Sequence, residues 1–271
     1  PLRVSAAVPL SERHRLEALV AAEGGGDSRL RWGAVKGFVD GSLGGATAWF
    51  LEDYQDLPGE RGGPIVDPAA LEAGIVEAAS MGLQPIVHAI GDAATAWLVE
   101  VYEGILRSYP GRDLRLRMEH AQHLAPATLA RLGHPGIVCS MQPCHLHDDA
   151  PWAERRLGAD RLGGAYALRG LLERGARPAF GSDWTVAPLD PRVNLDAAVH
   201  RRPGRQMEAP PWVPGQRISL GEALRAHTLD AARAGFLEVE TGSLEPGKRA
   251  DLVVLDRSPF HLSPEESFSA L

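Results

Sequence analysis

The sequence predicts an α/β protein built as a (β/α) barrel. Short apolar runs rich in Val, Ile and Leu alternate with longer stretches of helical period, and this alternation is typical of parallel β/α units with buried strands. Polar residues able to do chemistry follow many of these runs, and barrel enzymes build their active sites at the carboxyl ends of their strands. An open doubly wound sheet shows the same alternation but gathers its ligand groups at one switch point. No G-x-G-x-x-G motif opens a helix after the first run, so a dinucleotide-binding sheet has little support.

Six apolar runs are the predicted strands: residues 2–8, 34–39, 84–89, 114–119, 136–141 and 177–181. Five stretches between them have the period of helices: residues 12–22, 68–81, 93–109, 126–132 and 161–174. Gly82 and Gly175 follow two of these stretches, as is typical of helix ends. Pro68 and Pro126 stand in the first turn of a predicted helix, where proline is tolerated.

The pattern changes near the C-terminus. Residues 219–234 are predicted to form a helix, because Ser219 and Glu222 have the spacing of a capping box. A turn-rich link at 242–251 then leads into an apolar run at 252–255, which predicts a short strand. We therefore place a boundary near residue 238, with the barrel at 1–238 and a separate segment at 239–271.

The bulk composition is that of an ordinary globular protein. Of the 271 residues, 44% are hydrophobic and 23% are charged, and the formal net charge is −7. No nucleic-acid partner is expected, because proteins that bind the phosphate backbone carry basic patches. No run of about 18 apolar residues exists, so no membrane span is expected. The two cysteines, Cys139 and Cys144, form no disulfide framework, which favours a reducing cytoplasm.

Four residues stand out as candidate metal ligands: Lys36, His88, His120 and Asp183. Each lies at or near the end of a different apolar run, so strands that converge on one barrel mouth would bring them together. Imidazole nitrogens and carboxylate oxygens are ligands that Zn²⁺ prefers, although Fe and Mn share them. Taken singly, each residue also has an ordinary structural interpretation, as a snorkelling lysine, a hydrogen-bonded core histidine or a helix-capping aspartate.

Two further polar residues, Gln142 and His145, follow the fifth run, where a substrate pocket would lie. We expect both to contact substrate. Asp40 is expected to be a loop or capping residue. Glu119, next to a candidate ligand, is expected to be structural.

Five segments form an ordered set of motifs: VKGFVDGS at 35–42, HAIGD at 88–92, RMEHAQ at 117–122, MQP at 141–143 and GSDWTV at 181–186. In this order they resemble the amidohydrolase superfamily, and more narrowly its family 3 branch, which includes YtcJ-like proteins and the N-substituted formamide deformylases. The tail GSLEPGKRADLVVLD at 242–256 resembles the family's return into a small β-sandwich. The resemblance covers nearly the whole chain and implies a (β/α)8 TIM-type barrel with a piece of β-sandwich at 239–271.

The resemblance also implies roles for the four candidate ligands. Lys36 matches a lysine on barrel strand four that is often carboxylated by CO₂ and bridges two metal ions. His88 and His120 match the metal-binding histidines of strands five and six. Asp183 matches a strand-eight aspartate that binds metal, takes the proton from the attacking water and passes it to the leaving nitrogen. The implied activity is hydrolysis of an amide-type, non-peptide C–N bond by a metal-activated water, with one or two divalent ions, zinc first among them.

The chain departs from the family at one motif. The family has a His-x-His pair at the end of strand one, and the only histidine before Lys36 is His14, in a predicted helix. The pair His145-Leu146-His147 follows what looks like strand seven, so we do not assign it to strand one. By this count the six runs match strands three to eight. We expect the first strands to lie upstream in the natural protein, or another chain to cover the gap.

Three alternatives stay open from the sequence. A barrel fragment without the strand-one ligands can be non-catalytic or inactive. A hydrolase with a single metal ion can leave Lys36 unmodified. The same activated water can attack a phosphotriester or a lactone. A small N-acyl or N-formyl amide is the expected substrate, and a homo-oligomer is compatible with the sequence.

Overall fold

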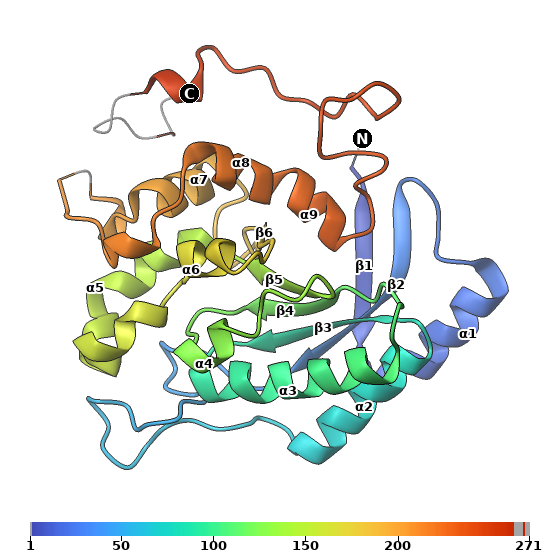
Figure 1. The fold of residues 1–271 in the computed structure, drawn as a ribbon, viewed down its shortest axis with the longest axis horizontal. Helices are drawn as coiled ribbons and strands as arrows, with labels where there is room; N and C mark the ends of the chain where they lie inside the picture. Colours follow the sequence, from blue (N-terminus) through green and yellow to red (C-terminus); the bar gives the residue numbers. More distant parts are fainter. Residues whose placement is uncertain (1, 207, 263–267, 269–271) are drawn as a thin grey trace.

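The computed structural model describes residues 2–206, 208–262 and 268. Its centre is one sheet of six parallel strands whose spatial order is their order in the chain (Figure 1). The strands are β1 (Val4–Pro9), β2 (Leu30–Phe38), β3 (Gln84–Ala89), β4 (Leu116–His120), β5 (Ile137–Met141) and β6 (Ala179–Phe180). Every neighbouring pair is parallel. The six predicted strands are confirmed, with shifts of a few residues at their ends.

The helices of the described chain are α1 (Arg13–Glu23), α2 (Pro68–Ser80), α3 (Asp92–Ser108), α4 (Pro126–Leu129), α5 (Leu146–Leu157), α6 (Leu168–Glu173), α7 (Pro191–His200), α8 (Leu220–His227) and α9 (Leu229–Ala234). α2 and α3 pack against β3, whereas α8 and α9 pack against β6. Figure 1 shows these two pairs of helices on opposite sides of the strands. No helix in the described ranges combines the length and the apolar character that crossing a membrane requires.

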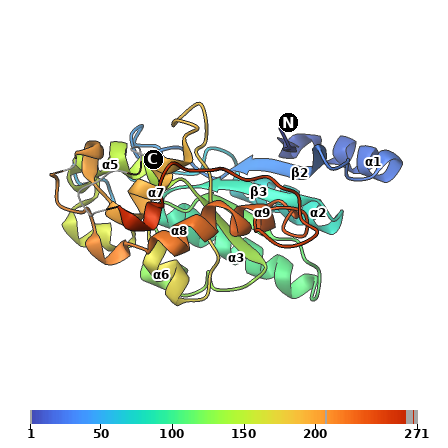
Figure 2. The ribbon, with the colours of Figure 1, turned by 90° about the horizontal axis from the view of Figure 1, so that it is seen from above.

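The packing of the core explains why the strands are continuous apolar runs in the sequence. Every residue of β5 is buried, and apolar side chains of α2, α3 and β4 pack together beside it, among them Ile75, Leu98, Tyr102 and Leu116. β1 is more exposed, because it lies at the edge of the sheet. In Figure 2 the sheet separates α1 at one end of the molecule from α5 at the other. A closed (β/α) barrel has eight strands, so this curled sheet of six corresponds to an incomplete barrel, as predicted.

The helix predicted at 161–174 is interrupted in the structure. A short 3-10 helix, η3 (Ala159–Gly164), comes first, and α6 follows it. A Cβ atom at Gly164 would lie 2.0 Å from the carbonyl oxygen of Leu124, so glycine permits a close approach of two segments here. Tyr166, with φ 47°, then turns the chain before α6 begins.

The helix predicted at 219–234 is also two helices. The capping box of Ser219 and Glu222 is present at the start of α8, as predicted. Thr228, with φ −117° and ψ −84°, leaves the helical region and separates α8 from α9. Two helices, α5 and α7, had not been predicted.

The predicted strand at 252–255 is absent from the structure. Residues 251–255 pair with no described strand, and the side chains of Val253 and Val254 are 83% and 86% exposed. An ion pair of Arg3 with Asp251, with Nε 2.8 Å from Oδ2, ties this segment to the start of β1. The boundary near residue 238 and the β-sandwich segment at 239–271 stay predictions.

Candidate metal centre

The predicted ligands lie at the carboxyl ends of the strands. Lys36 lies near the end of β2, His88 near the end of β3, and His120 is the last residue of β4. Asp183 follows β6. His145 ends the short 3-10 helix η2 (Pro143–His145), which follows β5. Because the strands are parallel, all five residues belong to the same end of the sheet.

Three of these side chains form a cluster that could hold a metal ion. His120, His145 and Asp183 each offer one ligand atom, and these atoms lie within 4.8 Å of one another. The ring of His88 is adjacent, with its centroid 4.5 Å from the centroid of the His120 ring. The structure therefore brings His88, His120 and Asp183 together and adds His145, for which the sequence had predicted only a substrate contact.

Lys36 lies beside the same cluster. Its Nζ atom is 4.8 Å from the ring centroid of Phe38, and that ring is 5.4 Å from the ring of His88. Burial lowers the pKa of Lys36, against the opposing attraction of the carboxylates of Glu119 and Asp183. A lower pKa raises the fraction of neutral amine, which is the form that reacts with CO₂. The environment of Lys36 thus favours its neutral amine.

Burial favours the neutral form of the histidines of the cluster. Burial lowers the pKa of His88 to about 4. Burial, reinforced by the neighbouring His88 and Lys36, lowers the pKa of His120 to about 3. Burial also lowers the pKa of His145. A neutral imidazole keeps one nitrogen lone pair, which is the form that binds a metal ion.

Hydrogen bonds determine which nitrogen of each histidine ring keeps its lone pair. Nε2 of His88 lies 2.8 Å from the carbonyl oxygen of Gly41, which can only accept, so Nε2 carries the hydrogen and Nδ1 the lone pair. Nδ1 of His120 lies 2.8 Å from Oε1 of Gln142, so Nε2 of His120 is free. Nε2 of His145 is buried and has no hydrogen-bond partner among the described residues. Neutral imidazole nitrogens beside a carboxylate are the donors that a divalent metal requires, so the residues present fit such an ion.

The backbone is strained at two of the candidate ligands. His120 has φ 74° and Asp183 has φ 54°, in the left-handed region that residues other than glycine rarely occupy. Such conformations cost of order 1 kcal/mol or more, and they cluster at functional sites because surrounding packing must support them. Both residues stand where a strand has just ended, which is where a change of chain direction can aim a side chain into the site.

Gln142 and Glu119 are both engaged within the protein. Oε1 of Gln142 faces His120, and Nε2 of Gln142 donates to the carbonyl oxygen of Ser140 at 3.3 Å. The substrate contact predicted for Gln142 stays a prediction. Glu119 accepts hydrogen bonds from Arg117 Nε and from the hydroxyl of Ser140, consistent with its expected structural role.

Asp40 has a larger role than the sequence indicated. Its buried carboxylate accepts hydrogen bonds from the backbone N–H groups of Trp49, Ile90 and Gly91. Oδ1 of Asp40 also lies 3.5 Å from Nε2 of His88. Asp40 therefore ties the loop after β2 to the end of β3, beside a candidate ligand. An aspartate that follows a strand looks the same in sequence whether it caps a loop or joins two loops.

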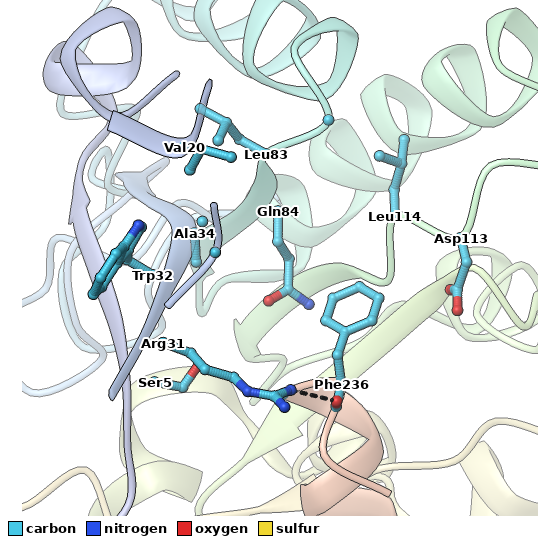
Figure 3. A pocket seen from close by; sticks show the side chains of 14 residues that line it. Ser5, Val20, Arg31, Trp32, Ala34, Leu83, Gln84, Asp113, Leu114 and Phe236 are labelled. Carbon is cyan, nitrogen blue, oxygen red and sulfur yellow. Dashed lines mark hydrogen bonds between the residues drawn. The ribbon is translucent and has the colours of Figure 1, made fainter. Parts of the chain in front are cut away.

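The pocket in Figure 3 lies at the opposite end of the sheet. It has a volume of about 340 Å³, and its walls include Trp32, Gln84 and Phe236, from the beginnings of β2 and β3 and from the segment after α9. Nη1 of Arg31 donates to the carbonyl oxygen of Phe236 across it. None of its described lining residues is a histidine or a candidate ligand. This pocket therefore lies apart from the candidate ligands at the carboxyl ends of the strands.

Comparisons with known proteins identify the family of the chain. A model of the amidohydrolase family matches residues 1–271. Protein LONG AFTER FAR-RED 3 of Arabidopsis thaliana is 43% identical over 244 residues, which cover 89% of this chain and 42% of that protein. The putative amidohydrolase YtcJ of Bacillus subtilis (strain 168) is 33% identical over 237 residues, which cover 88% of this chain and 44% of that protein.

A solved structure extends the agreement to three dimensions. An uncharacterized metal-dependent hydrolase from Pyrococcus furiosus matches with a TM-score of 0.81 and 33% identity, over 95% of this chain and 51% of that chain. The chain thus spans about half the length of the relatives it matches. The family model covers the chain from end to end, and the chain therefore belongs to the amidohydrolase family, in the family 3 branch that its motifs resemble.

Proposed function

We propose that the protein is a metal-dependent hydrolase of amide-type, non-peptide C–N bonds in small molecules. One observation carries this proposal: candidate ligands from separate strands converge at one end of a parallel sheet, with ligand atoms of His120, His145 and Asp183 within 4.8 Å of one another. Family membership and the names of two relatives, an amidohydrolase and a metal-dependent hydrolase, support the reaction class. Zinc is the proposed ion, because imidazole and carboxylate donors suit it.

Lys36, His88, His120 and Asp183 are the proposed ligands of one or two ions, with Lys36 contributing two oxygens as a CO₂-derived carbamate. A bound divalent ion would polarise the scissile carbonyl and lower the pKa of the attacking water. Asp183 is proposed to accept the proton of that water, because its carboxylate lies in the cluster and is open to solvent. The same carboxyl group then delivers the proton to the leaving nitrogen, so that one residue acts first as base and then as acid.

His145 is proposed to bind the substrate. Its Nε2 atom is buried without a described partner, and its ring centroid lies 6.2 Å from that of His120. Because Nδ1 of His145 bonds the backbone of Ser182, the lone pair is on Nε2, which can accept a hydrogen bond from the N–H group of an amide. His145 is also close enough to Asp183 to bind a metal ion. The two roles can be distinguished by measurement, because loss of a metal ligand lowers metal affinity whereas loss of a substrate contact raises KM.

The proposed substrate is a small N-acyl or N-formyl amide. A cytoplasmic location is part of the proposal, because Cys139 and Cys144 are free and buried, which fits a reducing compartment. We also retain a barrel at 1–238 and a β-sandwich segment at 239–271. The ion pair of Arg31 with Glu240 shows that the start of that segment contacts the beginning of β2.

The test uses the full natural protein that contains this chain. Bound metal is measured by elemental analysis, and release of amine is followed over a panel of N-formyl, N-acyl and cyclic amides, with lactones and phosphotriesters included. We expect amide turnover that falls at least 100-fold in Asp183→Asn, since a general acid–base typically contributes 10²–10⁴-fold. Asp160→Asn, at an exposed position outside the cluster, is the matched control.

Metal-loaded protein that releases amine from no panel member would overturn the proposed reaction. Turnover confined to lactones or phosphotriesters would replace the amide with another bond. Absence of bound metal after loading would favour an inactive barrel over an enzyme.

A further inference from the structure

Gln142 occupies an unusual position for a residue predicted to touch substrate. It directly follows β5, and its side chain is buried, with 4% of the residue exposed. Oε1 of Gln142 lies 2.8 Å from Nδ1 of His120, and Nε2 of Gln142 lies 3.3 Å from the carbonyl oxygen of Ser140. Both ends of the amide are thus occupied by protein groups.

The partners of Gln142 determine which way its amide faces. The carbonyl oxygen of Ser140 can only accept a hydrogen bond, so the NH₂ group of Gln142 must point toward it. The amide oxygen of Gln142 then faces His120 and can likewise only accept. The hydrogen of the His120 ring must therefore be on Nδ1, and the lone pair must be on Nε2.

We propose that Gln142 is a positioning residue that holds His120 in the Nδ1–H tautomer and thereby directs Nε2 toward the metal. Partners of this kind fix both the tautomer and the orientation of metal-binding imidazoles, and their loss typically costs 10–100-fold in metal affinity. The inference rests on the proposed metal-dependent function, and it gives Gln142 a role that acts through His120 rather than through substrate.

Strand register places Gln142 beside His120. Ser140 pairs with Ala179 of β6 and lies beside Glu119 of β4, so the backbone that orients the Gln142 amide is held from both sides. The ring of His120 is flanked by His88, at 4.5 Å between centroids, and has no other side-chain hydrogen bond among the described residues. Gln142 is therefore the one described side chain that can select the tautomer of His120.

The first test needs no substitution. In the full protein without metal, long-range ¹H–¹⁵N correlation spectra report which nitrogen of each histidine carries the hydrogen. We expect His120 to be the Nδ1–H tautomer. An Nε2–H tautomer in the wild-type protein would overturn the inference, whether or not any variant folds.

The second test compares Gln142→Met with Gln122→Met. Methionine is about as long as glutamine but accepts no strong hydrogen bond. Gln122 is also buried and donates to the hydroxyl of Tyr166, so it controls for loss of a buried amide nearby. In Gln142→Met we expect loss of the single Nδ1–H tautomer and a 10–100-fold weaker affinity for Zn²⁺, measured by competition with a chelator. In Gln122→Met both quantities should match wild type.

Gln142→Glu provides the conservative rescue, because a carboxylate also accepts from Nδ1–H. It should retain the tautomer and most of the Zn²⁺ affinity, even though it faces the carbonyl of Ser140 without a donor. A raised KM with unchanged tautomer and Zn²⁺ affinity in Gln142→Met would show a substrate contact and sink the positioning role. If wild-type protein binds no metal, the proposed function fails instead, and the tautomer still decides the role of Gln142.

Discussion

The Nε2 atom of His88 lies 2.8 Å from the carbonyl oxygen of Gly41, in the loop that follows β2. This contact gives His88 the opposite tautomer from His120, whose Nδ1 atom faces Gln142. Adjacent rings therefore present different nitrogens, Nδ1 from one and Nε2 from the other. In this way β3 and β4 can direct lone pairs toward one ion. They can do so although His88 and His120 are at different register positions along their strands.

Any side chain at position 41 should disturb the position of His88. A Cβ atom at position 41 would lie 2.0 Å from Oγ1 of Thr47, so Gly41→Ala must displace the loop and the carbonyl that fixes His88. We expect a 10–100-fold loss of Zn²⁺ affinity, measured by chelator competition. Gly63→Ala, on the same connection, meets no atom within 4 Å and should leave affinity unchanged. Equal affinities of both variants would mean that Gly41 does not position His88.

A variant of His145 should distinguish substrate binding from metal binding. We expect His145→Ala to retain wild-type metal content while KM for the amide rises by roughly tenfold, the effect of about one lost hydrogen bond. His120→Ala should lose metal, because it removes a proposed ligand from the cluster. Metal loss in both variants would reassign His145 as a ligand.

Asp149 should make stability depend on pH. Burial raises the pKa of this carboxyl from 3.8 to about 6, against the opposing hydrogen bond from the hydroxyl of Tyr166. The folded state therefore holds a proton that the unfolded state releases. The resulting stabilisation is full below about pH 4 and is lost as pH rises through 6, with at most about 3 kcal/mol involved.

Asp149→Asn mimics the protonated form and can still accept from Tyr166, so it should gain stability relative to wild type between pH 4 and pH 7. Urea unfolding across this range measures the difference. Asp148→Asn, at the exposed neighbouring position, should follow the wild-type pH dependence. Parallel pH profiles for wild type and Asp149→Asn would show that Asp149 ionises as it does in the unfolded chain.

Arg115 should be important for stability. Its side chain is 10% exposed, pairs with Asp113 and Glu238, and lies over the ring of Phe236 at 4.1 Å. Arg115→Met would leave Glu238 partly buried without its partner, and we expect a loss of about 3 kcal/mol in the free energy of unfolding. Arg15→Met, in an exposed pair, should cost less than about 0.5 kcal/mol. Similar losses for both variants would contradict the importance of the partly buried ion pair of Arg115 with Glu238.

Much of the site could be predicted because parallel strands place their carboxyl ends together. Lys36, His88 and His120 each lie at or near the end of an apolar run, and no knowledge of long-range contacts is needed to expect them at one end of the sheet. The hydrogen bond of Gln142 to His120 and the place of His145 in the cluster could not be predicted in this way. They depend on side-chain contacts between neighbouring segments after β4 and β5, and sequence periodicity carries no information on such contacts.

The errors in the fold predicted from the sequence have similar causes. Residues 161–174 have helical composition throughout, but the close approach at Gly164 is a tertiary contact that interrupts the helix. α7 begins with Asp190 as a side-chain cap followed by a proline, the same local signal as at the start of α2. Residues 252–255 have strand propensity, but no strand among the described residues pairs with them, and propensity alone forms no strand.

Diffraction from crystals of the full protein grown with Zn²⁺, with data collected at the zinc absorption edge, tests the central claim most directly. We predict an anomalous peak about 2 Å from Nε2 of His120 and from a carboxylate oxygen of Asp183, with Nδ1 of His88 facing the same centre. Ordered side chains at all three positions with no anomalous peak between them, or zinc bound only elsewhere, would contradict the account.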